Sequence, residues 1–457
     1  MSIELVIFDL DGVLFEGADL HYKALNKALE EIDTAYVITE AEHANTYNGL
    51  PTAKKLDMLT AAKGLDESLH GHVWKRKQEL FQNYVETFDV NERLVGVLRT
   101  LKNEGFKIFC ASNGIRRTVD IVLSKLGLET FIDASFSNED VTNHKPDPEI
   151  YHKCFDAAGL APTRCLIVED SYVGKLASKS SGAHLLPVRN PDDVTLERIH
   201  ECITYINAGH STAKINIVIP MAGMGSRFLS QGYTDPKPLI KISGKPMIQW
   251  VVENIGIAAN FIFIVREEHR DSYDLDEILQ KATCGMCKIV TVDKVTEGAA
   301  CSVLLAKEHF DNDDPFMIAN SDQYLEWNPF EFLNKAKDLD GLISCFDGAG
   351  PKWSYARLDE ISNKVVEVAE KKEISQHATT GVYYYRHGRD FVKYAGEMMA
   401  KNIRTNGEFY VCPVFNEAIQ DGKHVGICKV KKMWGIGTPE DLEVFVEQYV
   451  ENEDALY

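Results

Sequence analysis

The sequence predicts an α/β protein of two domains, each built on a doubly wound sheet with helices on both faces. Short apolar runs that suit buried strands alternate with helical stretches along the chain. Acidic or polar residues follow several of these runs, where the crevice of such a sheet lies. With 457 residues, the chain is also too long for a single hydrophobic core.

The composition is that of an acidic globular protein. A formal net charge of −20 argues against nucleic acid and anionic membranes as partners, because both require a basic surface. The N-terminus lacks a basic leader and no long apolar run follows, so we expect a cytoplasmic protein. Ten cysteines form no disulfide framework, and the lone pair Cys284 and Cys287 favours reduced thiols over a metal site.

The first predicted domain spans residues 1–209, with its core in residues 1–14 and 90–209. Its first strand, residues 5–10, is strongly apolar but carries Asp9 and Asp11 at its carboxyl end. An unpaired charge among apolar neighbours is costly, so the two acids predict a metal site, most plausibly for Mg²⁺.

Two further strands should end at the same crevice, at residues 108–112 and 165–170. The polar residues expected there are Asp9, Asp11, Ser112, Asn113, Lys145, Glu169 and Asp170. Residues 15–89 are rich in Ala, Leu, Lys and Glu and predict a mostly helical cap, inserted after the first strand. A cap selects substrates by excluding water from the crevice.

Four motifs, FDLDGVL, CASNG, HKPDPE and VEDSYVG, resemble in order those of the haloacid-dehalogenase-like phosphatases and phosphomutases. The resemblance implies a Rossmann-like core in which Asp9 forms an aspartyl-phosphate and Asp11 is the general acid. It further implies that Ser112 and Lys145 hold the phosphoryl group. Asp170 would complete the Mg²⁺ site with Asp9 and Asp11. A carboxylate nucleophile fits independently, because it divides hydrolysis into two displacements.

The cap resembles that of β-phosphoglucomutases in part. His21 and Lys77 match positions used there for substrate contact and cap closure, although His21 also suits an ordinary helix face. The arginine of the phosphate-gripping turn is replaced by the segment GLPTAKK around Thr52. Ser112 and Asn113 resemble the phosphatase branch, with Asn113 in substrate contact, which favours hydrolysis over mutase chemistry.

A tether separates the domains. Turn formers after residue 187 precede an amphipathic helix with Leu196, Ile199 and Ile203 at helical spacing, which should close the first domain. Residues 210–214 then form the linker, and residues 215–457 the second domain.

The second domain opens with a β-branched strand and the glycine loop MAGMGSRF. Its backbone N–H groups, with Arg227 and Lys237, predict a site for a polyphosphate. Strands are expected at 261–265, 288–292 and 316–319, and Asp322 follows the last of them as a candidate Mg²⁺ ligand or turn cap. The small residues of VTEGAACSVLLAK could admit a flat base or serve helix packing.

The second domain resembles nucleotidyltransferases of the sugar-nucleotide pyrophosphorylase type, which implies a mixed, GT-A-like sheet. The matching segments are PMAGMGSRF, DPKPLI, GKPMI, TEGAA, NSDQ, TTGVYYY, GEFY and WGIGTPEDL. The form of the first two is closer to the cytidylyltransferase-like and capsule-gene branches than to the thymidylyl or uridylyl enzymes, so CTP is the favoured NTP. The implied nucleotide-binding residues are Ala222, Gly223, Gly225, Ser226, Arg227, Lys237, Glu297, Gly298 and Ala299.

The resemblance also implies an acceptor site and exposes one departure. Lys371 would bind the phosphate of the acceptor, and Gly381 would line its pocket with backbone. Members of the family commonly hold a second metal through an aspartate for which Gly435 stands here. Either Glu408 supplies that carboxylate, or Asp322, phosphates and water hold the Mg²⁺.

These observations together predict a bifunctional enzyme that serves surface polysaccharide precursors. The second domain would transfer NMP from an NTP to a sugar or polyol phosphate, and the first would hydrolyse a phosphate ester of a related metabolite. Two alternatives stay open. The second domain could be a non-catalytic nucleotide sensor that regulates the phosphatase, or the first could be a phosphomutase.

Overall fold

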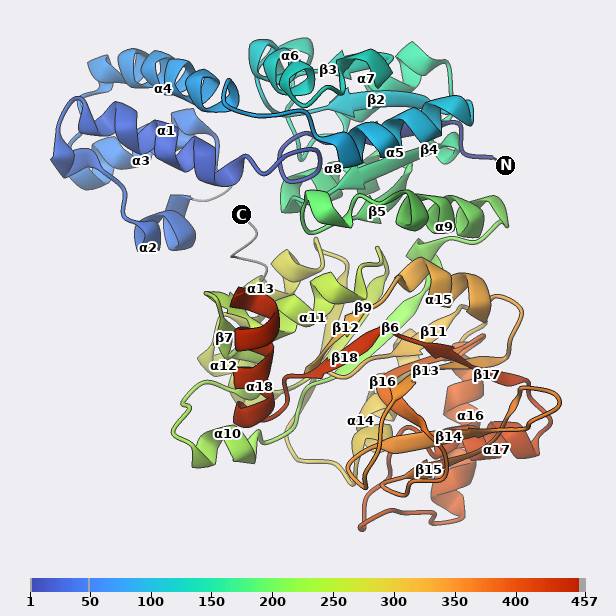
Figure 1. Ribbon diagram of the computed structural model, residues 1–457. Coiled ribbons are helices and arrows are strands. Elements are labelled where there is room, and N and C mark those ends of the chain that lie inside the picture. The colour runs from blue at the N-terminus through green and yellow to red at the C-terminus, as the bar shows by residue number, and fades with distance from the viewer. Residues whose placement is uncertain (1, 48–49, 452–457) are drawn as a thin grey trace. The chain divides into compact units, whose positions relative to one another are not determined.

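The computed structural model describes residues 2–47 and 50–451, and the chain divides into two compact units, Met1–Asn207 and Ala208–Tyr457 (Figure 1). Both units are α/β, as the sequence predicts. Within the described residues, no helix is both long enough and apolar enough to span a bilayer.

A five-stranded parallel sheet forms the centre of unit 1, in the order β3-β2-β1-β4-β5. The strands are β1 (Leu5–Phe8), β2 (Lys107–Ala111), β3 (Ala134–Phe136), β4 (Cys165–Glu169) and β5 (His184–Pro187). Every residue of β1 is buried, which is why its sequence is an uninterrupted apolar run. β1 is also the central strand, so the residues that follow it lie at the middle of the carboxyl edge of the sheet.

Helices cover both faces of this sheet. They are α5 (Glu92–Asn103), α6 (Arg116–Lys125), α7 (Glu149–Ala158), α8 (Tyr172–Ser181) and α9 (Leu196–Asn207). In α9, Ile199, Cys202 and Ile203 are buried while the intervening polar residues are not, so one stripe of the helix packs on the unit.

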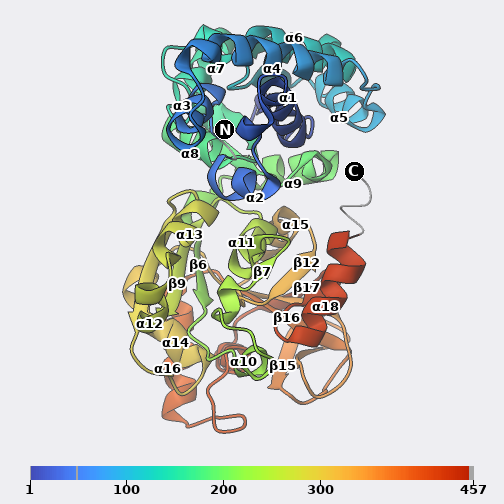
Figure 2. The same ribbon diagram turned by 90° about the vertical axis from the view of Figure 1, so that its left-hand side faces the viewer.

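A helical cap follows β1, as the sequence predicts, and contains α1 (Ala18–Glu30), α2 (Glu40–Glu42), α3 (Thr52–Lys63) and α4 (His70–Val85). Figure 2 shows α1 and α4 packed side by side. The cap has an apolar core of its own, in which Leu25, Leu29, Leu59 and Val73 are buried. The cap helices therefore pack on one another around this core.

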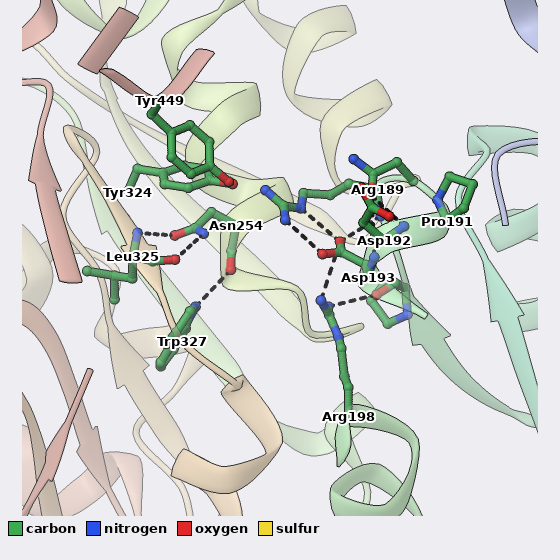
Figure 3. A network of polar contacts seen from close by, with 12 residues as sticks. Arg189, Pro191, Asp192, Asp193, Arg198, Asn254, Tyr324, Leu325, Trp327 and Tyr449 are labelled. Carbon is green, nitrogen blue, oxygen red and sulfur yellow. Dashed lines mark hydrogen bonds and ion pairs between the residues drawn. The ribbon is translucent and has the colours of Figure 1, made fainter. Parts of the chain in front are cut away.

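An ion-pair network closes the loop between β5 and α9 (Figure 3). The carboxylate of Asp193 accepts hydrogen bonds from Nε and Nη2 of Arg189 at 2.8 and 2.7 Å, and Nη1 of Arg198 lies 3.3 Å away. Burial opposes ionisation of Asp193, but the two guanidinium groups outweigh it and hold its pKa well below the usual range.

Unit 2 contains a nine-stranded mixed sheet whose main path runs β10-β9-β6-β11-β16-β13-β17. The parallel strands on one side are β6 (Asn216–Pro220), β9 (Asn260–Arg266), β10 (Cys287–Val292) and β11 (Phe316–Ile318). The strand β16 (His377–Tyr385) runs antiparallel to both β11 and β13 (Gly341–Asp347), and β17 (Val425–Lys429) is parallel to β13. The predicted mixed sheet is thus confirmed.

Helices and short strands complete unit 2. The helices are α10 (Ser226–Ser230), α11 (Met247–Ile255), α12 (Glu267–Ser272), α13 (Leu275–Ala282), α14 (Ala299–Leu305), α15 (Pro329–Ala336), α16 (Gly388–Ala400), α17 (Val414–Gln420) and α18 (Pro439–Phe445). The remaining strands are β7 (Lys241–Ile242), β8 (Lys245–Pro246), β14 (Ser354–Leu358) and β15 (Val365–Glu370), together with the ribbon of β12 (Gln323–Glu326) and β18 (Lys432–Gly435).

Asn254 anchors the ribbon to α11 (Figure 3). Its side chain accepts a hydrogen bond from the backbone N–H of Leu325 at 2.7 Å and donates one to the carbonyl of Leu325 at 2.8 Å. The indole N–H of Trp327 donates to the carbonyl of Asn254 at 2.9 Å. These hydrogen bonds hold the ribbon of β12 and β18 against α11, next to Asp322, the residue that directly precedes β12.

The buried network of unit 1 gives a stability prediction. Asp193→Asn should lower the free energy of unfolding by about 3 kcal/mol at neutral pH, because Arg198 is left buried without its counter-ion. Because the folded pKa of Asp193 is depressed, this contribution is present above the unfolded pKa of about 4 and is lost as the pH falls below it. Urea unfolding should therefore show a smaller difference at pH 3 than at pH 7.

Glu30→Gln is the control for this measurement. It removes an exposed ion pair with Lys27 and should cost less than about 0.5 kcal/mol. An Asp193→Asn variant as stable as this control at neutral pH would contradict the assignment of Asp193 as the counter-ion of Arg198.

Candidate active sites

The first candidate site lies at the carboxyl edge of the unit 1 sheet. Asp9 follows β1, Ser112 follows β2 and Asp170 follows β4, so three parallel strands deliver polar side chains to one edge. The backbone N–H of Asp9 still donates to the carbonyl of Val168 at 3.0 Å, which extends the ladder by one residue and fixes the direction of the side chain. Lys145 reaches the same edge from the loop before α7.

Lys145 is the centre of this site. Its ammonium donates to Oδ1 of Asp9 at 2.7 Å, to Oε1 of Glu169 at 2.8 Å and to the carbonyl of Ala111 at 2.8 Å. Burial alone would lower its pKa, but Asp9 and Glu169 outweigh burial and hold the pKa well above the usual value. Lys145 is therefore a permanent positive charge inside the site.

Three carboxylates of this edge suit a divalent cation. One oxygen each from Asp9, Glu169 and Asp170 lie within 4.8 Å of one another. Oδ1 of Asp170 is buried and accepts no hydrogen bond from the described residues. Burial raises the pKa of both Asp9 and Asp170, and neighbouring carboxylates add to the effect. A hard cation that takes oxygen ligands, such as Mg²⁺, would balance the negative charge of these buried carboxylates.

Two glycines allow these carboxylates to pack so closely. A Cβ at Gly174 would lie 1.6 Å from Oε1 of Glu169, and one at Gly12 would lie 2.1 Å from Oδ2 of Asp170. Gly12 also has a φ of +77°, in the left-handed region. The positions of the acids therefore depend on the absence of side chains opposite them.

Asp11, which we expected among the metal ligands, is directed toward the cap. Its Oδ1 lies 3.3 Å from Nε2 of His21, and Nδ1 of the same ring lies 2.9 Å from the ammonium of Lys77. The His21 ring stacks on Phe81 with centroids 4.0 Å apart. The structure thus brings the two predicted cap residues together with Asp11, in a chain of contacts that runs from the cap to the sheet.

Asn113, predicted to contact substrate, holds the backbone of Lys145. Its Oδ1 accepts from the N–H of Lys145 at 3.1 Å, and its Nδ2 donates to the carbonyl of Lys145 at 3.3 Å. The Ser112 hydroxyl is buried and accepts from the N–H of Gly114 at 2.9 Å. Asn113 thus fixes the backbone of Lys145, and Ser112 shapes the turn that follows β2.

The second candidate site surrounds the glycine loop between β6 and α10. Gly225 has a φ of +62°, and a Cβ there would lie 3.1 Å from Cβ of Lys237, so the loop and the lysine are in close contact. Gly223, Ser226 and Arg227 are exposed, whereas Ala222 is buried beneath them. The loop therefore offers backbone N–H groups and a cation to a ligand.

Lys237 and Asp322 form an ion pair across this site. Asp322 follows β11, and a Cβ at Gly437 would lie 2.6 Å from its Oδ2. The carbonyl of Asp322 accepts from the N–H of Ile436 at 3.0 Å. The segment after β18 thus packs directly against the carboxylate, with no room for a side chain.

A cavity of about 400 Å³ opens beside the loop. Its lining includes Gly225, Lys237, Arg266, His269 and Tyr273. Lys237 and Arg266 bring positive charge to this cavity, while Asp235 and Glu268 also line it, and Arg266 pairs with Glu268 at 2.9 Å.

The glycine of the TEGAA segment, Gly298, packs against the backbone of another segment. Gly298 has a φ of +133°, and a Cβ there would lie 2.4 Å from the carbonyl oxygen of Phe409. The N–H of Phe409 donates to the carbonyl of Glu297 at 2.8 Å, and the Glu297 carboxylate pairs with Arg404. Packing against the GEFY segment accounts for this glycine, while Ala299 remains partly exposed at the start of α14.

The predicted acceptor residues lie at the end of β15 and within β16. Lys371 has a φ of +56°, unusual for a lysine, and its ammonium contacts the Tyr410 hydroxyl. A Cβ at Gly381 would lie 2.2 Å from Nδ2 of Asn320 and 2.7 Å from Oε1 of Gln323. Gly381 therefore lets β16 approach the residues on either side of Asp322.

The structure supplies a carboxylate beside Gly435. A Cβ at position 435 would lie 3.4 Å from Oδ2 of Asp441, which stands in the first turn of α18. Glu408 is exposed, and no contact among the described residues joins it to Asp322. The pKa of Glu370 is raised first by burial and also by the nearby charge of Glu408. Sequence reasoning did not select Asp441 or the cavity residue Arg266 as site residues, although Asp441 lies within the matching segment WGIGTPEDL.

Two family models match the chain. The model described as haloacid dehalogenase-like hydrolase matches residues 6–188, and the model described as nucleotidyl transferase matches residues 217–452. Among curated proteins, a phosphorylated carbohydrates phosphatase of Thermotoga maritima is 28% identical over 216 residues, covering 47% of this chain and 93% of its own. A β-phosphoglucomutase of Bacillus subtilis is 26% identical over 219 residues, covering 44% and 95%.

Solved structures resemble the chain in part. A nucleoside-diphosphate-sugar pyrophosphorylase from Vibrio cholerae RC9 is 28% identical, with a TM-score of 0.46 over 51% of this chain and all of its own. A UDP-glucose pyrophosphorylase complexed with UDP-glucose is 19% identical, with a TM-score of 0.43 over 52% of this chain and 98% of its own.

The crowding at Gly174 can be tested directly. Gly174→Ala should displace Glu169 from Lys145 and weaken binding of Mn²⁺, a probe for Mg²⁺, to unit 1 by at least about tenfold. Electron paramagnetic resonance titration measures the free ion. Gly96→Ala is the matched control, since it lies in a helix with open space around it. Unchanged Mn²⁺ affinity in Gly174→Ala would show that Glu169 is not needed to hold the site.

Proposed function

The chain belongs to the nucleotidyl transferase family through residues 217–452 and carries a haloacid dehalogenase-like hydrolase unit before it, and on this premise we propose a bifunctional enzyme. Unit 2 transfers NMP from an NTP to a sugar or polyol phosphate, and unit 1 hydrolyses a phosphate ester. The observation that carries the proposal is a lysine–carboxylate ion pair in each unit. Lys145 pairs with Asp9 in unit 1, and Lys237 pairs with Asp322 in unit 2.

In unit 1, an oxygen of Asp9 attacks the phosphorus of the ester, and the ester P–O bond breaks. Asp11 gives its proton to the departing alcohol oxygen, and His21 beside it keeps that carboxyl oriented. Water then attacks the aspartyl-phosphate, Asp11 takes its proton, and inorganic phosphate leaves. Lys145 and Ser112 hold the phosphoryl oxygens.

Asp9 and Asp170 would hold Mg²⁺, with Glu169 beside them. When bound, Mg²⁺ would neutralise negative charge on the oxygens of the phosphoryl group. Lys145 already neutralises part of the carboxylate charge before any cation binds. The contact with Lys145 also fixes the buried side chain of Asp9, which would keep its carboxylate oriented for nucleophilic attack.

In unit 2, a phosphate oxygen of the acceptor attacks the α-phosphorus of the NTP, and the bond to the β-phosphate breaks to release pyrophosphate. No protein nucleophile is needed, so catalysis is positioning and charge neutralisation. Gly223, Gly225 and Ser226 offer backbone N–H groups to the triphosphate, and Arg227 and Lys237 offer charge.

The remaining predicted residues bind the acceptor and the base of the NTP. Lys371 binds the phosphate of the acceptor, Gly381 lines its pocket, and the base lies between Ala222 and the segment Glu297, Gly298 and Ala299. CTP is the preferred NTP because the loop sequence is closer to the cytidylyltransferase-like branch than to the thymidylyl or uridylyl enzymes. The product would be a CDP-activated sugar or polyol for surface polysaccharide synthesis.

The two activities should separate by mutation. Asp9→Asn should abolish phosphate release from phosphate esters, because the amide is not a nucleophile, and leave pyrophosphate release intact. Lys237→Ala should lower pyrophosphate release at least about 100-fold and spare phosphate release. Both products are measured in parallel with Mg²⁺, each NTP and a panel of sugar and polyol phosphates.

Lys241→Ala, at an exposed position four residues further along, serves as the control for Lys237. No pyrophosphate from any pair in a folded sample would refute the transferase. Nucleotide that bound and altered the phosphatase rate without being consumed would instead identify a sensor. Activation of unit 1 by a sugar bisphosphate, with slow hydrolysis, would identify a mutase.

For the second metal carboxylate of unit 2, we infer Asp441 in preference to Glu408, because Asp441 borders the position that Gly435 leaves without a side chain. Asp441→Asn should raise the Mg²⁺ concentration for half-maximal rate about tenfold and weaken Mn²⁺ binding in the presence of CTP to a similar extent. Glu408→Gln and the exposed control Glu443→Gln should change neither. The reverse pattern, with Glu408→Gln defective, would restore Glu408 as the ligand.

A further inference from the structure

Tyr151 is a buried tyrosine at the catalytic edge of unit 1 to which the hydrolytic steps assign no role. It lies in α7, and its hydroxyl donates to Oε1 of Glu169 at 3.1 Å. The centroid of its ring lies 5.0 Å from the ammonium of Lys145. A phenylalanine would fill the same space, so the contact of the hydroxyl with a buried carboxylate requires an explanation.

The ammonium of Lys145 has three N–H groups, and each of them already has an acceptor. The acceptors are Oδ1 of Asp9 at 2.7 Å, Oε1 of Glu169 at 2.8 Å and the carbonyl of Ala111 at 2.8 Å. In the proposed reaction Lys145 must also hold an oxygen of the phosphoryl group. It must therefore release one of these acceptors when the substrate binds.

Glu169 is well supplied with donors other than Lys145. Its Oε1 accepts from Tyr151, and its Oε2 accepts from the backbone N–H of Ser171 at 3.0 Å and from the Ser171 hydroxyl at 3.1 Å. A Cβ at Gly174 would lie 1.6 Å from Oε1, so α8 packs directly against this carboxylate. Glu169 therefore keeps three hydrogen bonds and its position when Lys145 turns away.

Release of Asp9 would serve the reaction less well. Asp9 is the proposed nucleophile, and its carboxylate must approach a phosphoryl group that also carries negative charge. Without Lys145, the two anions would repel one another at short range. Exchange of Glu169 for a phosphoryl oxygen keeps the ammonium between the two groups that react.

The hydroxyl of Tyr151 determines what this exchange costs. A buried acceptor that loses its only donor bears the full desolvation penalty, whereas one that keeps a donor does not. With Tyr151 in place, Oε1 of Glu169 keeps one donor after Lys145 has moved. Without the hydroxyl, no donor among the described residues would remain on that oxygen.

We propose that Tyr151 is a positioning residue of unit 1, which holds Glu169 so that Lys145 can exchange that carboxylate for an oxygen of the phosphoryl group. The inference rests on the proposed hydrolase function and adds to it a residue that acts through Glu169. Lys145 holds the phosphoryl group before and during the displacement. Tyr151 therefore contributes to binding of the phosphoryl group and not to the height of the chemical barrier.

The test is Tyr151→Phe in the full chain at saturating Mg²⁺, with inorganic phosphate as the ligand. Isothermal titration calorimetry should show that Kd for phosphate rises about tenfold, because one hydrogen bond to a buried charged group is lost. With p-nitrophenyl phosphate as substrate, KM should rise by a similar factor and kcat should change less than about threefold. An unchanged Kd for phosphate would refute the role of Tyr151.

A double-mutant cycle with Glu169→Gln shows whether Tyr151 acts through Glu169. The neutral carboxamide competes less for Lys145, so Glu169→Gln should bind phosphate at least as tightly as the unaltered protein. Adding Tyr151→Phe to this variant should change Kd less than about twofold. A tenfold effect that persists in the Glu169→Gln background, or a loss of phosphate binding in Glu169→Gln alone, would overturn the proposal.

Tyr205→Phe is the matched control, because it removes the hydroxyl of a buried tyrosine in α9, outside the elements that carry the named site residues. Its Kd, KM and kcat should be unchanged. If Tyr151 were merely structural, Tyr151→Phe would lower Tm and the folded fraction. Calorimetry would then show fewer binding sites with an unchanged Kd, and that result contradicts a positioning role.

These measurements also separate the inference from the proposed function. If the unaltered protein binds phosphate but hydrolyses no ester, or if Asp9→Asn hydrolyses esters at the unaltered rate, the proposed function fails. If hydrolysis is lost in Asp9→Asn while Tyr151→Phe binds phosphate as the unaltered protein does, the phosphatase stands and the role of Tyr151 is refuted.

Discussion

Each unit depends on a lysine that neutralises a carboxylate at the end of a parallel strand. In unit 1, Lys145 lies within 2.8 Å of both Asp9 and Glu169, and in unit 2 Lys237 pairs with Asp322. Without the lysine, acids at such a strand end would repel one another at short range. The lysine offsets part of this repulsion and lets the acids lie close together, and the surrounding loops are shaped to hold it.

The fold and the strand-end residues were predictable because both follow from local patterns. A fully buried parallel strand is an apolar run, and a charge directly after it must lie at the edge of the sheet. Asp9, Asp170 and Asp322 were selected by this reasoning and lie after the strands β1, β4 and β11. The helical cap was equally visible in the composition between the first two strands.

Contacts between distant segments were not predictable from local patterns. Asn113 holds the backbone of Lys145, 32 residues away, and Gly298 meets the carbonyl of Phe409. Asp441 approaches Gly435 because α18 folds back on β18. Glycine signalled close approach correctly at Gly298, where the approaching group is the backbone of Phe409.

The Lys237–Asp322 pair has a thermodynamic consequence for ligand binding. The two charges satisfy one another across the site. In the proposed function Asp322 would hold Mg²⁺ and Lys237 would meet the triphosphate, so the first of these ligands to bind would separate the pair and release the partner of the other. The affinities of metal and nucleotide would then be positively coupled, and the coupling would be reciprocal. Such a site would respond to the metal–nucleotide complex as a single ligand.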